Sequence, residues 1–218
     1  MGGTGHHPSE WIAMKPEELA LLKQHFPEAS VAMVGAMYEQ RRFVLQFKRP
    51  RNSKLGDFRA PRSMTSICHI TLNCDLNPYQ MLITYVHEVA HYDVYQQYKP
   101  QQPQPHGQEW QNTFAALLRP FMTGSIFPKD VLEALEQHLQ HIKASSTADQ
   151  NLQRVLRQYD RHSEGVCTVE SLPEGARFVM KNGLVFQKGE KQRTRYLCLC
   201  ISNGRTYCVS ALAEVKPT

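Results

Sequence analysis

The feature of the sequence that most restricts the fold is a long segment framed by prolines. Asn77-Pro78 has the form of a helix start, with asparagine as the N-cap and proline in the first turn, and no further proline occurs before Pro100. The segment Pro78–Tyr98 is therefore predicted to be a helix of about five turns. The proline-rich run at 99–105 cannot continue that helix and is expected to form an extended loop.

The middle of this predicted helix carries the sequence His87-Glu88-Val89-Ala90-His91. Residues four apart on a helix differ by about 40° of rotation, so both imidazoles project from one face and can bind one metal ion. Zinc in catalytic sites takes three protein ligands and a water, so a third ligand is required. His106 has the best context, because it lies beyond the proline-rich loop at the mouth of the next predicted helix. The other candidates in principle are His25, His69, His138, His141 and His162.

Glu88 lies beside the ligand face of the predicted helix. There its carboxylate can take a proton from the zinc-bound water and relay it to a leaving amine, while zinc polarises the scissile carbonyl. The pattern thus predicts one catalytic Zn²⁺ and a hydrolase that acts on a protein or peptide substrate. Two alternatives stay open: the histidines only face solvent or pack in a core, or the zinc is structural in a nucleic-acid-binding or adaptor protein. A structural site is normally closed by a fourth ligand and needs no base, so Glu88 favours catalysis.

Four short motifs lie in the order and spacing of the SprT-like family, the Spartan-type zinc metallopeptidases, which the chain resembles over about residues 30 to 125. They are Leu55-Gly56, His69-Ile70-Thr71-Leu72-Asn73, His87-Glu88-x-x-His91 and His106-Gly107-x-x-Trp110. The resemblance implies an α+β, zincin-like metallopeptidase domain with a small sheet packed on the active-site helices. It also implies a zinc endopeptidase with Glu88 as the base, and proteolysis of DNA-associated or DNA-crosslinked proteins as the best-known role.

The resemblance further implies where an extended substrate lies. In zincins the strand before the active-site helix forms the upper edge of the cleft and pairs with the peptide. In this chain that strand is Ile67 to Leu72, and the expected substrate contacts are Ile67, His69, Ile70 and Thr71.

The other elements are predicted from hydrophobic periodicity and turn signals. They are helices over 16–40, 110–118, 128–142 and 149–159, strands over 42–48 and 66–72, and a basic, turn-rich connection over 49–57. From Gly165 onward, short alternating runs are separated by Asn182-Gly183, Lys188-Gly189 and Asn203-Gly204, and Asn-Gly is a strong hairpin signal. We therefore expect a leader over 1–15, a metallopeptidase domain over 16–164, and a small antiparallel β module over 165–218.

Basic charge is concentrated in two windows of the sequence. Residues 41–62 hold eight Lys or Arg and one acid, and residues 175–205 hold seven and one. Such segregation is typical of a surface that meets a polyanion, although a solvated face gives the same pattern. In the β module, DNA contacts are predicted at Lys188, Lys191, Arg193 and Arg195, with Tyr196 stacking on bases.

The cysteines and the apolar runs complete the expectations. Many SprT-like proteins end in a zinc ribbon of two C-x-x-C pairs, whereas this chain offers Cys198 and Cys200, then Cys208, with Cys167 far upstream. A second structural zinc is therefore not expected, and buried thiols are favoured. No apolar run approaches the roughly 20 residues of a membrane span, and the first residues lack the pattern of a secretory signal. A cytoplasmic protein is expected, and the sequence gives no indication of its oligomeric state.

Overall fold

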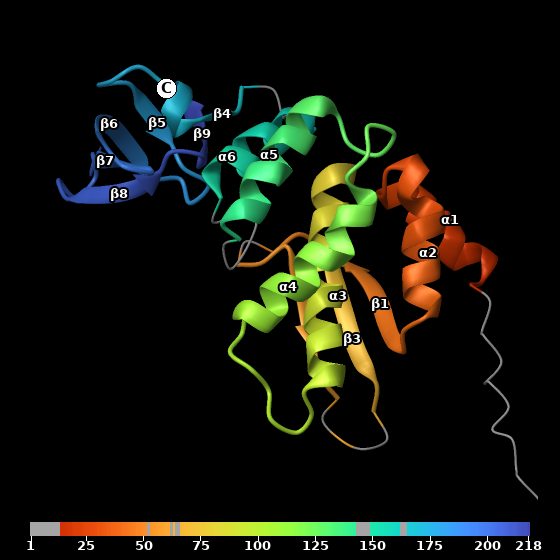
Figure 1. The fold of residues 1–218 in the computed structure, drawn as a ribbon. Coiled ribbons are helices and arrows are strands. Elements are labelled where there is room, and N and C mark those ends of the chain that lie inside the picture. The colour runs from red at the N-terminus through yellow and green to blue at the C-terminus, as the bar shows by residue number, and fades with distance from the viewer. Residues whose placement is uncertain (1–13, 52, 62, 64–65, 143–148, 162–164) are drawn as a thin grey trace, which may run out of the picture. The chain divides into compact units, whose positions relative to one another are not determined.

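The computed structural model describes residues 14–51, 53–61, 63, 66–142, 149–161 and 165–218 (Figure 1). The chain divides into two compact units, residues 1–159 and residues 160–218. The predicted domain boundary near residue 165 falls close to this division. The predicted leader lies almost wholly outside the described residues.

The first unit has mixed helical and strand structure, as expected for the α+β class. Its helices are α1 (Pro16–His25), α2 (Val31–Glu39), α3 (Pro78–Gln97), α4 (Gln108–Leu118), α5 (Lys129–Gln140) and α6 (Gln150–Leu156). Short 3-10 turns lie at Glu28–Ser30, Arg119–Phe121 and Arg157–Tyr159. Its strands are β1 (Phe43–Lys48), β2 (Gly56–Arg59) and β3 (Cys68–Asn73).

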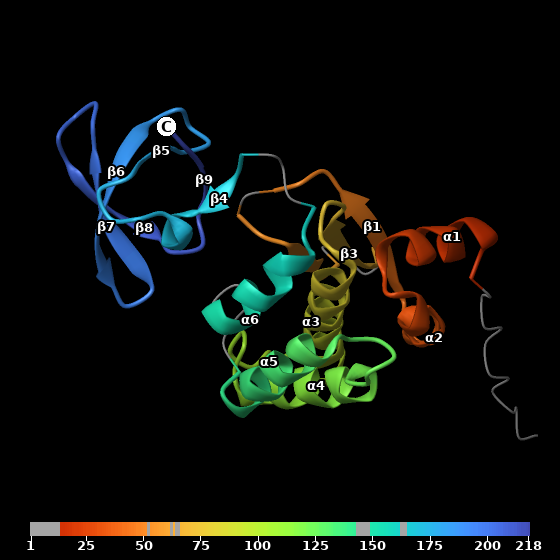
Figure 2. The same ribbon diagram turned by 90° about the horizontal axis from the view of Figure 1, so that it is seen from above.

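Helix α3 confirms the prediction made from the proline-framed segment. The side chain of Asn77 accepts a hydrogen bond from the backbone N–H of Gln80 at 3.0 Å, which satisfies one of the free donors of the first turn. Viewed from above, α3 lies between the sheet on one side and α4 and α5 on the other (Figure 2). Because it is covered on both sides, it is buried along most of its length, and it forms the centre of the unit.

The three strands form a sheet in the order β1-β3-β2, with β1 parallel and β2 antiparallel to β3. Along β3, Cys68, Ile70 and Leu72 are buried in the core with α3. The alternate positions His69 and Thr71 point to the opposite, open face, as the alternation of the sequence predicted. The strand begins at Cys68 rather than Ser66, so Ile67 lies outside it and is 49% exposed.

The core of the first unit is completed by the apolar stripes of α4 and α5. Trp110, Phe114 and Leu118 of α4 are fully buried at the spacing predicted for a helix that packs through one face. The rings of Trp110 and Phe114 stack, with centroids 5.1 Å apart and planes 7° from parallel. This stack supports the floor of the site described below.

The second unit is an antiparallel β module, as predicted. Its strands are β4 (Cys167–Thr168), β5 (Arg177–Val179), β6 (Val185–Gln192), β7 (Arg195–Cys200), β8 (Thr206–Ser210) and β9 (Glu214–Pro217), with a 3-10 turn at Val169–Ser171. They pair in the order β4-β9-β5-β6-β7-β8. The predicted turns at Asn182-Gly183 and Asn203-Gly204 join β5 to β6 and β7 to β8, and both glycines have positive φ.

The predicted turn at Lys188-Gly189 is wrong. Both residues lie inside β6, where the pairing with β7 is irregular between Lys188 and Lys191. A Cβ added to Gly189 would lie 2.6 Å from the carbonyl oxygen of Leu197, so glycine is needed there for close approach of two backbones rather than for a turn. The chain instead reverses after Gln192, which pairs with Arg195.

Candidate metal centre

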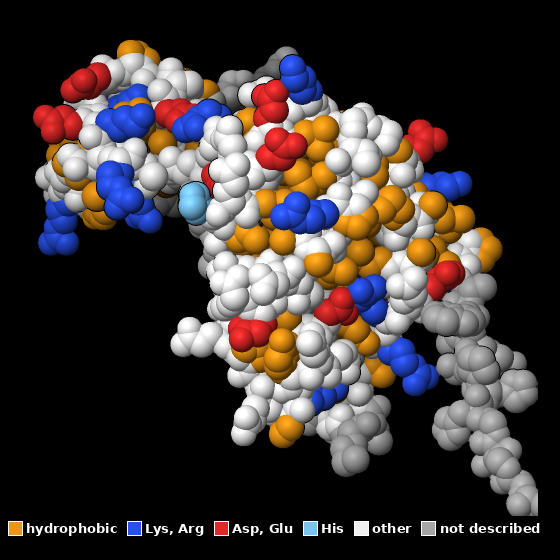
Figure 3. Space-filling model, in the orientation of Figure 1, with side chains coloured by type: hydrophobic (Ala, Val, Ile, Leu, Met, Phe, Trp, Pro, Cys, Tyr) orange, Lys and Arg blue, Asp and Glu red, His pale blue; other side chains and the backbone are white. Residues whose placement is uncertain are grey.

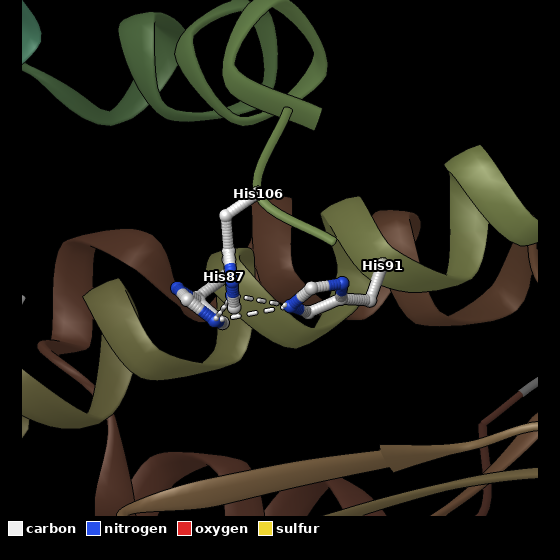
Figure 4. Close-up of side chains that lie close together, drawn as sticks. All are labelled: His87, His91 and His106. Carbon is white, nitrogen blue, oxygen red and sulfur yellow. Dashed lines mark hydrogen bonds between the residues drawn. The ribbon is translucent and has the colours of Figure 1, made fainter. Parts of the chain in front are cut away.

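Three imidazoles converge on one point beside α3, and they are those of His87, His91 and His106 (Figure 4). The Nε2 atom of His91 lies 3.2 Å from Nε2 of His87 and 3.0 Å from Nε2 of His106. The third side of this triangle, between His106 and His87, is 3.3 Å. When each neutral imidazole carries its proton on Nδ1, the three Nε2 atoms have no proton to share, and together they could hold a metal ion.

The triangle has the dimensions that zinc requires. Tetrahedral coordination with Zn–N bonds of about 2.0 to 2.1 Å places the ligand nitrogens about 3.3 Å apart. The observed separations of 3.0 to 3.3 Å match this value within a few tenths of an ångström. The predicted ligand set is therefore brought together, and it offers nitrogen donors that suit zinc.

The three imidazoles are held in the neutral form that binds metal. Burial, followed by the neighbouring His106, lowers the pKa of His91 to about 4. Burial also lowers the pKa of His106, and burial followed by the other histidines places the pKa of His87 well below its usual range. Neutral imidazoles have free lone pairs at physiological pH, so a cation need not displace protons to bind.

The third ligand arrives from the loop between α3 and α4. His106 has a φ of 60°, in the left-handed region that non-glycine residues rarely adopt. Its carbonyl oxygen accepts a hydrogen bond from Nε2 of Gln111 at 3.0 Å, which ties the loop to α4. The ring of Trp110 lies beneath the site, with centroid distances of 4.6 Å to His87 and 4.7 Å to His106. This aromatic floor restricts the imidazoles to the positions from which they converge.

Glu88 is buried next to this centre, with 6% of its surface exposed. Burial raises the pKa of its carboxyl to about 8, whereas a hydrogen bond from the backbone of Phe58 in β2 acts in the opposite direction. A cation on the adjacent histidines favours the ionised carboxylate and lowers this pKa. Glu88 is therefore held beside the three histidines by its burial and by the hydrogen bond from β2.

Gly56 makes close contact with Glu88. A Cβ added at Gly56 would lie 2.5 Å from Oε1 of Glu88, 2.8 Å from its Cγ and 2.8 Å from Cγ2 of Thr84. Strand β2 therefore approaches the base so closely that only glycine fits. Leu55-Gly56 is one of the motifs of the SprT-like resemblance, but its local sequence does not predict a strand, and the start of β2 falls in the predicted connection over 49–57.

The predicted substrate strand is wrong in its pairing. Strand β3 pairs with β1 over Cys68–Asn73 and with β2 over residues 69–72, so this stretch has no free edge for a peptide. Of the four predicted contacts, Ile70 is fully buried, Thr71 is 6% exposed, and His69 faces the open side of the sheet. Ile67 is exposed but lies outside the strand. The edge strand beside Glu88 is β2.

The hydrogen-bond alternation of β2 identifies which backbone groups are at the edge. The N–H of Asn73 donates to the carbonyl of Leu55 at 2.8 Å, so Leu55 and every second residue after it face β3. Gly56 and Phe58 are the intervening residues, and their backbone groups turn toward the outer edge. The bond from Phe58 to Glu88 follows from this alternation.

The predicted DNA contacts of the β module divide into two groups. Lys188 is 6% exposed; its ammonium donates to the carbonyls of Glu170 and Leu172 and lies 4.1 Å from the centroid of the Tyr196 ring. The prediction is therefore wrong for Lys188. One face of the Tyr196 ring is already in contact with the Lys188 ammonium. Lys191, Arg193 and Arg195 are exposed at the β6–β7 hairpin, so their DNA contact stays a prediction.

Among the described residues, the cysteines of the β module do not form a cluster that could bind a metal ion. Cys198 and Cys200 are buried on the same face of β7, as predicted for residues two apart, whereas Cys208 is exposed and Cys167 is partly buried. Among the described residues, the group with metal-binding geometry is that of the three histidines.

Comparisons with known proteins give no match: no protein-family model, no curated protein and no solved structure is similar to this chain. None of the described helices combines the length and the apolar character that a bilayer span requires.

Proposed function

We propose that this chain is a zinc-dependent endopeptidase of the SprT-like, zincin-like type. In this proposal His87, His91 and His106 hold one Zn²⁺ and Glu88 is the general base. The observation that carries the proposal is the convergence of three neutral Nε2 atoms within 3.0 to 3.3 Å of one another, with a buried carboxylate next in sequence to one of them.

The composition of the centre supports catalysis over a structural role. Structural zinc sites are closed by four protein ligands, whereas catalytic sites use three and leave one position open. Among the described residues, the side chains that converge are three histidines. Glu88 is not one of them, and its carboxylate instead accepts a hydrogen bond from β2. A carboxylate beside such a site, but outside the ligand set, is suited to proton transfer.

Each residue then has a defined task. Zinc in this position would polarise the scissile carbonyl and lower the pKa of a water molecule. Glu88 accepts a proton from the attacking water and delivers it to the leaving amine. Gly56 and Phe58 hold the carboxylate by contact and by hydrogen bond, so that it need not reorganise during the reaction.

We assign substrate alignment to the outer edge of β2 instead of β3. The backbone groups of Gly56 and the carbonyl of Phe58 turn to that edge and could pair with an extended peptide, while the Phe58 N–H is bonded to Glu88. Such a peptide would pass close to Glu88, because Phe58 belongs to the edge strand and its backbone is hydrogen-bonded to the Glu88 carboxylate. The resemblance to the SprT-like family suggests proteins bound or crosslinked to DNA as substrates.

A comparison of three proteins tests the proposal: the wild type, Glu88→Gln and His91→Ala. Zinc content is measured together with hydrolysis of casein and of the chain itself, with and without DNA. We expect Glu88→Gln to retain zinc and to lose turnover, mainly in kcat, because the amide is nearly isosteric but cannot accept the proton. His91→Ala should lose zinc. Full turnover in Glu88→Gln would rule out the assigned base, and a wild type that binds no zinc would rule out the whole proposal.

A further inference from the structure

The face of the three-stranded sheet that points away from α3 is hollowed into a groove of about 690 Å³. Among the described residues that line it, four are basic, namely Lys48, Arg49, Arg51 and Arg59, and none is acidic. His69 and Thr71, the outward positions of β3, form its floor. Four of the eight basic residues of the first window therefore lie on one concave surface.

The charges of this groove are largely uncompensated. Arg51 is fixed by neutral partners: its Nε donates to Oδ1 of Asn73 at 2.8 Å and its Nη1 to Oγ1 of Thr71 at 3.0 Å. These bonds orient the guanidinium without neutralising it. Asp57 bonds Lys54 at 2.7 Å and Arg59 at 2.6 Å, so one carboxylate is shared between two cations. By contrast, acidic and basic side chains are interspersed over the helical face of the unit (Figure 3).

We propose that this groove, named here the sheet groove, binds the phosphate backbone of double-stranded DNA without reading its sequence. The inference concerns a second surface and does not depend on peptide hydrolysis at the histidine centre. It accounts for the concentration of four cations on one face of the sheet, with the guanidinium of Arg51 oriented by neutral partners.

The span of the groove favours a polymer over a single anion. Lys48 is opposite Asn73, and Arg59 is opposite His69, so the two cations lie on the outer strands and four residues apart along the sheet. With strands about 4.8 Å apart and a rise of about 3.3 Å per residue, their Cα atoms are about 16 Å apart. One strand of a duplex places about five phosphates over this length at about 3.4 Å each. Several cations can therefore meet several phosphates.

Two features favour duplex DNA over other polyanions. An acidic peptide usually gains affinity from backbone hydrogen bonds, but the groove floor is β3, whose backbone is already paired on both sides. Single strands are usually held by stacking on aromatic side chains, and the imidazole of His69 is the one aromatic ring among the described residues that line this groove. Side-chain cations and hydroxyl groups remain, and these are the partners of phosphate oxygens.

The position of Arg59 links the two surfaces. It lines the sheet groove and belongs to β2, whose outer edge passes Glu88. DNA held in the groove would lie about one strand away from the proposed peptide cleft, so a protein attached to the DNA would be presented to it.

The test measures binding of the full-length chain to two labelled duplexes of about 20 base pairs with unrelated sequences. Fluorescence anisotropy gives the affinity at each of several salt concentrations. The test variant is the double substitution Lys48→Ala, Arg49→Ala. The matched control, Lys23→Ala, Lys129→Ala, removes two exposed charges from helices α1 and α5. Zinc content and circular dichroism verify that both variants are folded.

We expect the wild type to bind both duplexes alike, with log affinity falling linearly with log salt. The test variant should flatten the slope by about 1.8 units, because each lost phosphate contact contributes about 0.9. The control should leave the slope unchanged, and Lys48→Arg should preserve it. An unchanged slope in the test variant, an equal change in the control, or tighter binding of single strands or polyglutamate than of duplex would each overturn the proposal. Since the readout is binding, its failure is distinguishable from failure of the peptidase proposal.

Discussion

Replacement of Gly56 by alanine would move the proposed general base without touching a metal ligand. The new Cβ would lie 2.5 Å from Oε1 of Glu88 and 2.8 Å from Cγ2 of Thr84. Non-bonded heavy atoms settle at about 3.5 Å, so the carboxylate must retreat by about 1 Å. Thr84 and Glu88 lie one turn apart on the same face of α3, which limits how far the helix can yield.

The size of the effect follows from this displacement. A misplacement of about 1 Å in a reacting group costs about 100-fold in rate, or about 2.7 kcal/mol of activation free energy. We therefore expect kcat of Gly56→Ala to fall by about two orders of magnitude. Overpacking should also reduce the free energy of unfolding by about 1 to 3 kcal/mol. Zinc content should be unchanged, since no histidine ligand is among the nearest contacts of the added methyl group.

The assay measures zinc content, thermal unfolding and the rate of casein hydrolysis for Gly56→Ala and for a matched control. Gly124→Ala is the control, because a Cβ there meets no atom within 4 Å. Turnover of Gly56→Ala within twofold of the wild type would refute the assigned role of β2 in holding Glu88. Parallel loss of zinc and turnover would also refute it, because the methyl group would then have disturbed the ligands and not the base alone.

Three further substitutions have defined outcomes. His106→Ala should sharply reduce the zinc content measured by elemental analysis, whereas His69→Ala should not, because only His106 belongs to the converging group of histidines. Full zinc occupancy in His106→Ala would contradict this assignment. Asn77→Ala should lower the free energy of unfolding by about 1 to 2 kcal/mol in urea titrations, because α3 loses its N-cap acceptor, and an unchanged midpoint would contradict the capping role. Lys188→Ala should lower the stability of the β module by about 2 kcal/mol, because the carbonyls of Glu170 and Leu172 lose a charged donor, yet leave the DNA salt slope unchanged. A flatter slope at wild-type stability would restore Lys188 as a DNA contact.

The parts of the fold that could be predicted are those that depend on neighbouring residues. The N-cap and first-turn proline at Asn77-Pro78 are local signals, and the i, i+4 spacing of His87 and His91 follows from helix geometry alone. His106 could be predicted as the third ligand because the proline-rich loop after α3 is long enough for the chain to return to the two helical histidines. Its left-handed backbone could not be predicted, because that conformation depends on the packing around it.

The errors arise where long-range pairing decides the outcome. Strand β2 has the sequence Gly-Asp-Phe-Arg, which has little intrinsic preference for a strand and forms through its pairing with β3. Once β2 is missed, β3 is mistaken for an edge strand. The burial of Lys188 could have been detected, because Phe186 lies two residues earlier on the inward face of β6. Basic residues in a row favour an exposed surface, but successive side chains of a strand point to opposite faces of the sheet. Lys188 is on the buried face of β6.

The carboxylate of Glu88 and the two histidines on α3 are held in place by parts of the molecule that differ in how many partners they have. The ligands His87 and His91 lie on α3, the most buried helix of the first unit, whereas the base receives its hydrogen bond from a four-residue strand with one partner. Short edge strands open locally at a lower free energy than the core of the fold. Opening of β2 would release Glu88 while the metal ligands stay in place. Heating should therefore abolish turnover before it releases zinc, and the amide of Phe58 should exchange its hydrogen with solvent sooner than those in the middle of α3.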